Sequence, residues 1–234
     1  MGVRTTMGSV LTTNRCNKMP MIHAQRAVSG ARVTPAASSQ VASAAPHVAT
    51  LLALLRSGEQ SAATAFNRIA HRLSAGELAL AAPQLISLID DEERHDAALA
   101  RHCTALPSVP NTDAATRRFF RRLESREATV HLARIAALDA CVCQVLTRLL
   151  ARTDPALLGE SLRDLLSRIR ADEARHVRMS RDLVLLMGAD TALLRLINAE
   201  VRQGFAPVLE SRALAFDALG VDHRHLIATI RREH

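Results

Sequence analysis

The sequence contains no tryptophan and no tyrosine, and only 5 of its 234 residues are phenylalanine. Hydrophobic residues still make up 48% of the chain, so its core must consist of aliphatic side chains, chiefly those of Leu and Ala. Gly and Pro, which interrupt helices, number only 9 and 8. Because Ala and Leu favour the helix more than most residues do, this composition predicts an all-α protein.

Long apolar runs are missing as well. A membrane-spanning helix needs about 18 or more apolar residues, and the longest candidate, Val48 to Leu55, ends at Arg56. We therefore expect no membrane span. The cysteines lack the spacing of a zinc or rubredoxin-type site, and the closest pair lies two residues apart in a helical stretch, where the side chains point to different sides. A reducing cytoplasm suits these four residues best: Cys16, Cys103, Cys141 and Cys143.

Acidic residues are absent from the first 49 positions. The formal charge of +7 would by itself suggest a nucleic-acid partner. Five basic residues lie in this acid-free segment, however, and the rest of the chain is nearly neutral with both signs interspersed, as on an ordinary protein surface. We therefore predict no nucleic-acid partner.

The same N-terminal segment is rich in Ser, Thr, Ala and Arg, a composition typical of an organelle transit peptide. A disordered tail, or a true start near Met19 or Met21, explains it equally simply, and we favour this interpretation. We expect residues 1–45 to be a disordered tail, residues 46–220 to form the folded domain, and residues 221–234 to be a frayed polar end.

The apolar periodicity from residue 46 onward is helical almost throughout. Short turns after the first and third helices predict two antiparallel hairpins, and the longer link between them allows a crossover. This connectivity is typical of a four-helix bundle with one long connection, here with an additional C-terminal helix that Pro207 would kink. The predicted helices cover residues 46–73, 77–106, 112–152, 160–187 and 191–219.

Two segments near the middle of predicted helices repeat each other: Asp91-Glu92-Glu93-Arg94-His95 and Asp172-Glu173-Ala174-Arg175-His176. The spacing i, i+3 puts Glu92 and His95 on the same face of their predicted helix, and Glu173 and His176 on the same face of theirs. In both helices this face is also the one that carries the apolar residues. Ionised groups at core positions cost several kcal/mol unless they are paired or bind a metal. A single copy would indicate a core histidine beside an ion pair, whereas two copies favour a metal site formed by Glu92, His95, Glu173 and His176.

Two further carboxylates follow from the expected hairpins. Counting back from a turn near residue 75 places Glu92 level with Glu59, and counting back from a turn near residue 156 places Glu173 level with Asp139. Glu127 is the rival on the same predicted helix, but it lies about 18 Å along the helix from the required level. We therefore predict the ligand set Glu59, Glu92, His95, Asp139, Glu173 and His176.

Two aspartates and two arginines beside the predicted ligands can orient the ligand histidines and balance the charge of the site. Asp91 and Asp172 can accept the free ring N–H of a ligand histidine, which fixes the ring. Arg94 and Arg175 can then balance the negative charge. Ordinary surface ion pairs are the alternative for these four residues.

The doubled motif resembles that of the ferritin-like di-iron carboxylate proteins, above all acyl-carrier-protein desaturases, with ribonucleotide reductase small subunits, rubrerythrins and bacterial monooxygenase hydroxylases as relatives. The resemblance covers residues Val48 to Met187. It implies two iron ions, with manganese as the alternative, because carboxylates with one imidazole per metal suit either ion. The absence of Tyr excludes a tyrosyl-radical subunit, and the absence of a Cys-x-x-Cys pair excludes a rubredoxin module. The chain is also shorter than the desaturases, so their substrate does not carry over.

We accordingly expect a di-iron oxidase or oxygenase that hydroxylates, desaturates or N-oxygenates a small or carrier-bound organic substrate. No flavin or nicotinamide fingerprint is visible, so its electrons would come from a ferredoxin or reductase, or from the substrate. The alternatives are an iron-binding protein that scavenges peroxide or dioxygen, and a metal-free helical interaction module. Three points stay open: whether the chain forms a homodimer, whether Cys143 lines the site or fills the core, and whether Glu200 covers the site or lies on the surface.

Overall fold

The computed structural model describes residues 35–73 and 82–232, and these residues contain helices but no strand. The prediction of an all-α protein is therefore confirmed for this part of the chain. Four helices are long and carry the site, and the others are shorter. Their bounds are α1 (Pro35–Leu73), α2 (Ala82–Thr104), α3 (Ala114–Leu123), α4 (Ala128–Arg152), α5 (Pro155–Leu158), α6 (Glu160–Leu186), α7 (Thr191–Glu210), α8 (Ala213–Ala218) and α9 (His223–Arg231).

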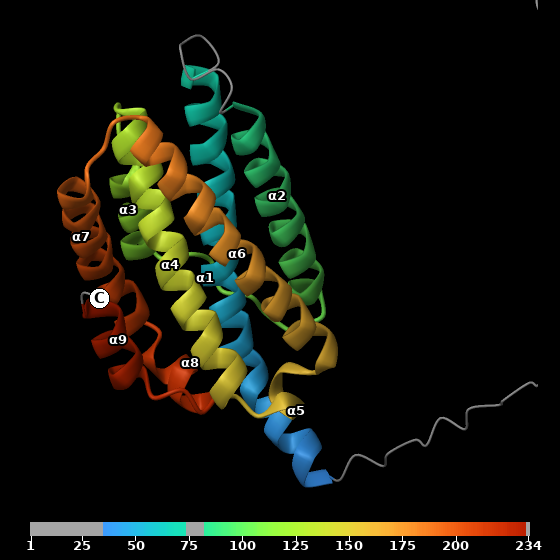
Figure 1. Cartoon of the computed structure of the whole chain (residues 1–234). Coiled ribbons are helices and arrows are strands. Elements are labelled where there is room, and N and C mark those ends of the chain that lie inside the picture. Colours follow the sequence, from blue (N-terminus) through green and yellow to red (C-terminus); the bar gives the residue numbers. More distant parts are fainter. Residues whose placement is uncertain (1–34, 74–81, 233–234) are drawn as a thin grey trace, which may run out of the picture. The chain divides into compact units, whose positions relative to one another are not determined.

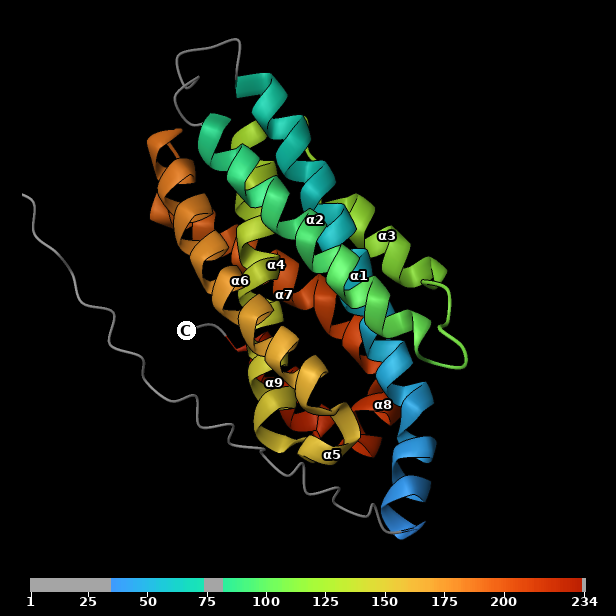
Figure 2. The ribbon, with the colours of Figure 1, turned by 90° about the vertical axis from the view of Figure 1, so that its right-hand side faces the viewer.

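The long helices form two antiparallel pairs, α1 with α2 and α4 with α6 (Figures 1 and 2). Within each pair the helices pack along much of their length, whereas α1 with α4, and α2 with α6, share smaller interfaces. A longer connection that contains α3 joins the two pairs, so α2 and α4 run in the same direction. α7 packs on α4, and α9 packs on α7. The site lies between the two pairs.

The core between these helices is aliphatic, as the composition predicts. Its largest fully buried side chains are almost all Leu and Ile, with Phe66 and Phe216 as the aromatic exceptions. Burying one such side chain contributes about 1.5–3 kcal/mol. The polar side chains buried among them therefore stand out, and most of them belong to the predicted site.

The N-terminal boundary was predicted too late in the chain. Helix α1 begins at Pro35, so Pro46 lies inside the helix instead of opening it. The missing N–H of Pro46 removes one helical hydrogen bond, but Ala44 and Val48 on either side are buried in the core, and this packing holds the helix together. Residues 1–34, which make up most of the predicted tail, lie outside the described residues.

The predicted helix 112–152 is two helices, because the chain between α3 and α4 becomes extended at Glu124 (φ −61°, ψ 140°). Asp113 caps α3 by accepting a hydrogen bond from the Thr116 amide at 2.8 Å. The stretch 191–219 is likewise two helices, α7 and α8, and Pro207 lies within α7. The guanidinium of Arg212, at the junction, donates a hydrogen bond to the Val208 carbonyl at 2.8 Å and so caps the C-terminal end of α7.

The C-terminal segment does not fray where the sequence predicts. Helix α9 covers residues 223–231, with Leu226, Ile227 and Ile230 buried. The buried guanidinium of Arg202 donates to the Ile230 carbonyl at 3.0 Å, which ties α9 to α7. Three apolar residues at helical spacing are enough to dock a short helix, although charged residues surround them in the sequence.

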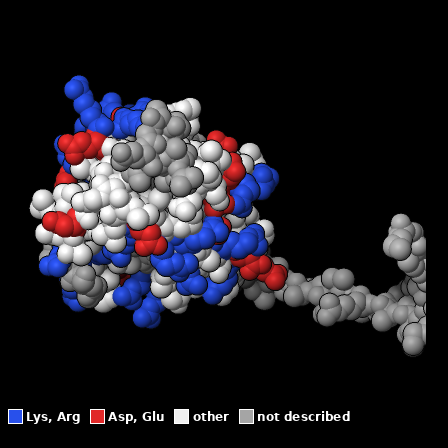
Figure 3. Space-filling model, turned by 45° about the horizontal axis from the view of Figure 1, so that its top comes forward, with Lys and Arg blue, Asp and Glu red and all other residues white. Residues whose placement is uncertain are grey.

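One described helix, α4, is long and apolar enough to cross a membrane by length and composition, with a mean hydropathy of 1.4 over 18 consecutive residues. Of that window, 61% is buried against the rest of the fold, as in the core helix of a globular protein. On the face shown in Figure 3, basic and acidic side chains are interspersed. The absence of a membrane span and of a nucleic-acid partner both stay predictions.

Candidate metal centre

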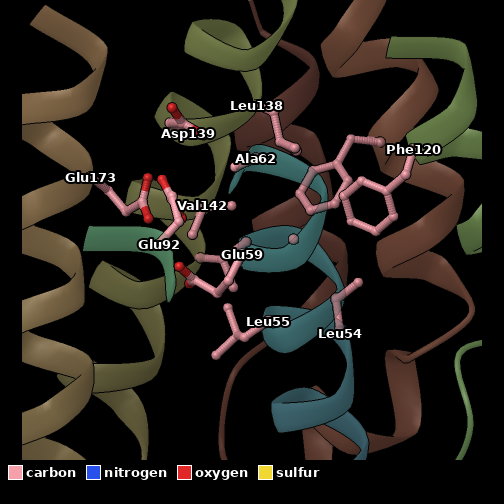
Figure 4. A pocket seen from close by; sticks show the side chains of 13 residues that line it. Leu54, Leu55, Glu59, Ala62, Glu92, Phe120, Leu138, Asp139, Val142 and Glu173 are labelled. Carbon is pink, nitrogen blue, oxygen red and sulfur yellow. The ribbon is translucent and has the colours of Figure 1, made fainter. Parts of the chain in front are cut away.

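The structure brings the six predicted ligands together in the interior. One comes from α1, two from α2, one from α4 and two from α6, and each of the six is at most 4% exposed. Figure 4 shows the four carboxylates converging from these helices on one space. The six residues are Glu59, Glu92, His95, Asp139, Glu173 and His176.

Within this cluster the ligand atoms form two overlapping groups. Glu59, Glu92, His95 and Glu173 offer atoms that all lie within 4.8 Å of one another, and so do Asp139, Glu173 and His176. Glu173 belongs to both groups. Glu92 extends to the second group as well, because its Oε1 lies 3.0 Å from His176 Nδ1. Each group can hold a metal ion, with Glu92 and Glu173 between them.

Several of these buried atoms lack a partner. Glu92 Oε1, Asp139 Oδ2, Glu173 Oε2 and His176 Nδ1 have no hydrogen bond within the described part of the chain, although Glu92 Oε1 and His176 Nδ1 are close. More than 90% of buried polar groups in native proteins are satisfied, so four orphans in one place need an explanation. All four belong to the predicted ligands. A cation among them would supply the missing partner, so the residues fit a metal.

The electrostatics of the carboxylates point the same way. Burial, reinforced by Glu173 and Glu59, holds the pKa of Glu92 and that of Asp139 well above their usual values. Burial also raises the pKa of Glu173, against the favourable interaction with His176 nearby, whose Nδ1 lies 3.7 Å from Glu173 Oε2. Without a cation these groups must take up protons to limit their repulsion, whereas a bound cation would favour the ionised forms instead.

Each histidine contacts an aspartate of the other helix pair through its Nε2 atom, the ring nitrogen that faces away from the carboxylate cluster. His95 Nε2 on α2 donates to Asp172 Oδ2 on α6 at 3.1 Å, and His176 Nε2 on α6 approaches Asp91 Oδ2 on α2 at 3.2 Å. An imidazole whose Nε2–H is engaged in this way presents its Nδ1 lone pair to a metal. His95 Nδ1 lies 3.0 Å from Glu59 Oε2, and His176 Nδ1 lies 3.7 Å from Glu173 Oε2, so both Nδ1 atoms face the carboxylate cluster.

The two aspartates are joined to each other through arginine. Arg175 contacts the Asp91 carboxylate and donates to Asp172 Oδ1 at 3.0 Å, while Arg94 contacts the second oxygen of Asp91. The contacts of these aspartates with the histidines and with the arginines are present, whereas their supporting role beside a bound metal stays a prediction. The sequence did not reveal that each aspartate crosses to the histidine of the opposite pair.

The rival positions lie elsewhere. Glu127 is the residue before α4 and is exposed. Glu200 forms an ion pair with Arg134 at 3.0 Å on the surface of α7 and α4, so it does not cover the site. Cys143 is half-buried, lines a separate surface pocket, and has its pKa raised to about 12 by burial and the nearby carboxylates.

A narrow cavity adjoins the cluster on its carboxylate side. Glu59, Glu92, Asp139 and Glu173 form one wall, and apolar side chains form the remainder. Its volume of about 30 Å³ is room for about two water-sized molecules. Two of its lining residues, Phe120 on α3 and Phe205 on α7, were not predicted from the sequence, because their position depends on how α3 and α7 dock on the long helices. The apolar lining is Leu54, Leu55, Gly58, Ala62, Phe120, Leu138, Val142, Val145 and Phe205.

No model of a protein family, no curated protein and no solved structure matches this chain.

Proposed function

We propose that this chain is a ferritin-like protein that holds two iron ions and uses dioxygen to oxidise an organic substrate. The observation that carries the proposal is the pair of overlapping ligand groups, each with one histidine, that share Glu173. Di-iron carboxylate bundles use one Glu from each of two helices and a Glu-x-x-His pair from each of the other two. Here the α1 position is Glu59, and the α4 position is the shorter Asp139.

The arrangement of the helices supports the same assignment. Two antiparallel pairs joined by one long connection are compatible with the ferritin-like topology that we propose, and the ligand groups lie between the two pairs. The C-terminal helices α7 and α9 pack outside these four on the α4 side and do not contribute a ligand to either group.

The donor set favours iron or manganese, because hard carboxylate oxygens with one imidazole per ion suit these metals. Glu59 and His95 would serve one ion, Asp139 and His176 the other, with Glu92 and Glu173 between them. Bound ferrous ions would supply the electrons for the first reduction of dioxygen. We propose that a separate ferredoxin or reductase then restores the reduced state.

The protein's own groups prepare the site for this chemistry. Asp172 and Asp91 hold the imidazoles by their Nε2 atoms, and Arg175 keeps both aspartates in place. The apolar lining of the cavity excludes bulk water from the carboxylate side, so reactive oxygen species are kept from solvent protons. The reacting part of a substrate must be apolar to replace the contacts of this lining.

A second function is favoured by one specific observation. The cavity of about 30 Å³ accepts dioxygen or peroxide as it stands, but an organic substrate requires it to widen. An iron-binding protein that consumes peroxide or dioxygen needs no more room than this. The substrate dependence of oxygen consumption separates the two functions.

The test is anaerobic reconstitution of the full chain with ferrous iron, followed by metal analysis and oxygen-electrode measurements. We expect about two iron ions per chain and oxygen uptake that increases with an organic substrate. Glu173→Ala should lose both metals, while the exposed Glu127→Ala should behave like the parent protein. A parent protein with no bound iron, or with the same iron content as Glu173→Ala, would refute the proposal.

A further inference from the structure

The two ligand groups of the metal centre differ in the carboxylates that belong to one group alone. Glu59 of α1 is a member of the first group, and Asp139 of α4 is a member of the second. Glu173 is a member of both, and Glu92 of the first group also approaches His176 of the second at 3.0 Å. The difference between the two groups is therefore a glutamate on α1 against an aspartate on α4.

The shared glutamate faces both groups to a similar degree. Glu173 Oε1 lies 4.0 Å from the Nδ1 atom of His95, and Glu173 Oε2 lies 3.7 Å from the Nδ1 atom of His176. Each histidine is in turn engaged at its Nε2 atom by an aspartate of the opposite helix pair. Neither the imidazoles nor the shared carboxylate distinguishes the two positions, so the residues on α1 and α4 must do so.

The α1 carboxylate reaches the histidine of its group, whereas the α4 carboxylate does not. Glu59 Oε2 lies 3.0 Å from His95 Nδ1, so these two donor atoms are adjacent. The ligand atom of Asp139 lies within 4.8 Å of those of Glu173 and His176. No ion pair joins Asp139 to another residue in the described part of the chain, however, and its Oδ2 has no hydrogen-bond partner there.

The length of the side chain explains this difference. Aspartate has one methylene group fewer than glutamate, so its carboxylate stays closer to its own helix, and in Figure 4 the carboxylate of Asp139 lies apart from that of Glu173. The inner cavity borders Asp139 and leaves about 30 Å³ of free space, room for about two water-sized molecules. A glutamate at this position would therefore have space to extend, so the packing does not require the shorter residue.

We propose that the two ions bind with unequal affinity, a tight one beside Glu59 and His95 and an exchangeable one beside Asp139 and His176. The affinity of a carboxylate site depends on the number and charge of its ligands and on its rigidity, and the α4 side offers the shorter and less engaged carboxylate. The inference rests on the proposed function, because the oxidation that we propose needs both ions. The concentration of free ferrous iron then regulates the activity through the Asp139 position.

The test is anaerobic calorimetric titration of the metal-free full chain with ferrous sulfate. We expect two binding steps of one ion each, with dissociation constants that differ by about tenfold or more, which corresponds to about 1.4 kcal/mol. Asp139→Glu lengthens the carboxylate into the free space and should strengthen the second step until it approaches the first. Oxygen uptake, measured at increasing iron concentration, should begin only as the second step is filled.

The reverse change tests the other position. Glu59→Asp shortens the α1 carboxylate and should weaken the first step toward the second, whereas Glu127→Asp, the same shortening at an exposed position before α4, should leave both steps unchanged. Circular dichroism checks the folding of each variant. Two equal constants in the parent protein, or a second step that Asp139→Glu leaves unchanged, would overturn the unequal affinity but not the metal centre. A parent protein that binds no iron would refute the metal centre itself.

Discussion

Asp139→Asn should have opposite effects on the metal-free and the metal-loaded protein. Asp139 is 3% exposed, and its Oδ2 has no partner among the described residues. Burial and the charges of Glu173 and Glu59 raise its pKa, so in the metal-free state the carboxyl group is destabilising. Asparagine has the same shape and no charge. The variant should therefore unfold at a higher temperature than the parent protein when metal is absent.

The amide of asparagine is still a buried polar group, so the expected gain is the additional cost of the carboxyl charge beside Glu173 and Glu59, on the order of 1–3 kcal/mol. For a chain of this length 1 kcal/mol shifts the melting temperature by about 2–4 °C, so the metal-free variant should melt about 2–12 °C higher. With iron present the order reverses, because the neutral amide is a poor ligand and the second ion is lost. The stabilisation that the ion adds by binding the folded state is lost with it.

The assay is thermal unfolding by circular dichroism, with and without ferrous iron, together with metal analysis. The matched control is Glu127→Gln, which makes the same chemical change at an exposed position directly before the same helix, with no side-chain capping bond. It should be nearly silent in both states. Suppose that Asp139→Asn lowers the melting temperature of the metal-free protein and still binds as much iron as the parent protein. Asp139 is then a structural residue, and its assignment as a ligand from its distance to the hairpin turn is wrong.

Three further predictions follow from the site and the cavity. Because the pKa values of Glu92 and Asp139 are raised in the folded protein, their contribution to the stability of the metal-free protein is fully present below the usual carboxyl pKa of about 4 and declines as pH rises through the folded pKa values. The metal-loaded protein should instead lose stability on acidification, because it releases its metal. Melting curves from pH 4 to 8 test this, and the same pH dependence with and without iron would mean that no ion binds. Asp172→Asn should weaken metal binding about 10–100-fold without changing helix content, measured by competition with a chelator, and an unchanged affinity would mean that the His95 contact does not orient a ligand. Gly58→Ala should stabilise α1 by up to about 1 kcal/mol, because the added Cβ meets Phe120 only at van der Waals distance. A lower midpoint in urea unfolding would show that the packing between Gly58 and Phe120 is tighter than described.

The sequence was sufficient for those parts of the molecule that depend on local periodicity and on the length of a hairpin. Glu92 and His95 follow from the i, i+3 spacing within one helix, and Asp139 follows from its distance to the next turn. These arguments need no knowledge of how distant helices dock. They succeed because an antiparallel pair fixes the level of each residue on one helix against the other.

The features that the sequence did not predict depend on docking or on weak local signals. The break at Glu124 was missed because no Gly or Pro marks it between Phe120 and Leu132. Phe205 reaches the cavity only through the packing of α7 on α4. The docking of α9 was missed because only three of its residues are buried apolar ones, among polar neighbours.

The crossed contacts between the two helix pairs have a mechanical consequence. A slip of α6 along α2 by one turn, about 5.4 Å, would break the His95–Asp172 and His176–Asp91 contacts together and separate both ligand groups. Because α2 and α6 otherwise share a small interface, these few polar groups, and the ions that we propose between them, fix the sliding register of the two pairs. Amide hydrogen exchange at the α2–α6 seam should therefore slow on metal binding more than exchange inside either pair, so that the iron supply determines how rigidly the two halves of the bundle are joined.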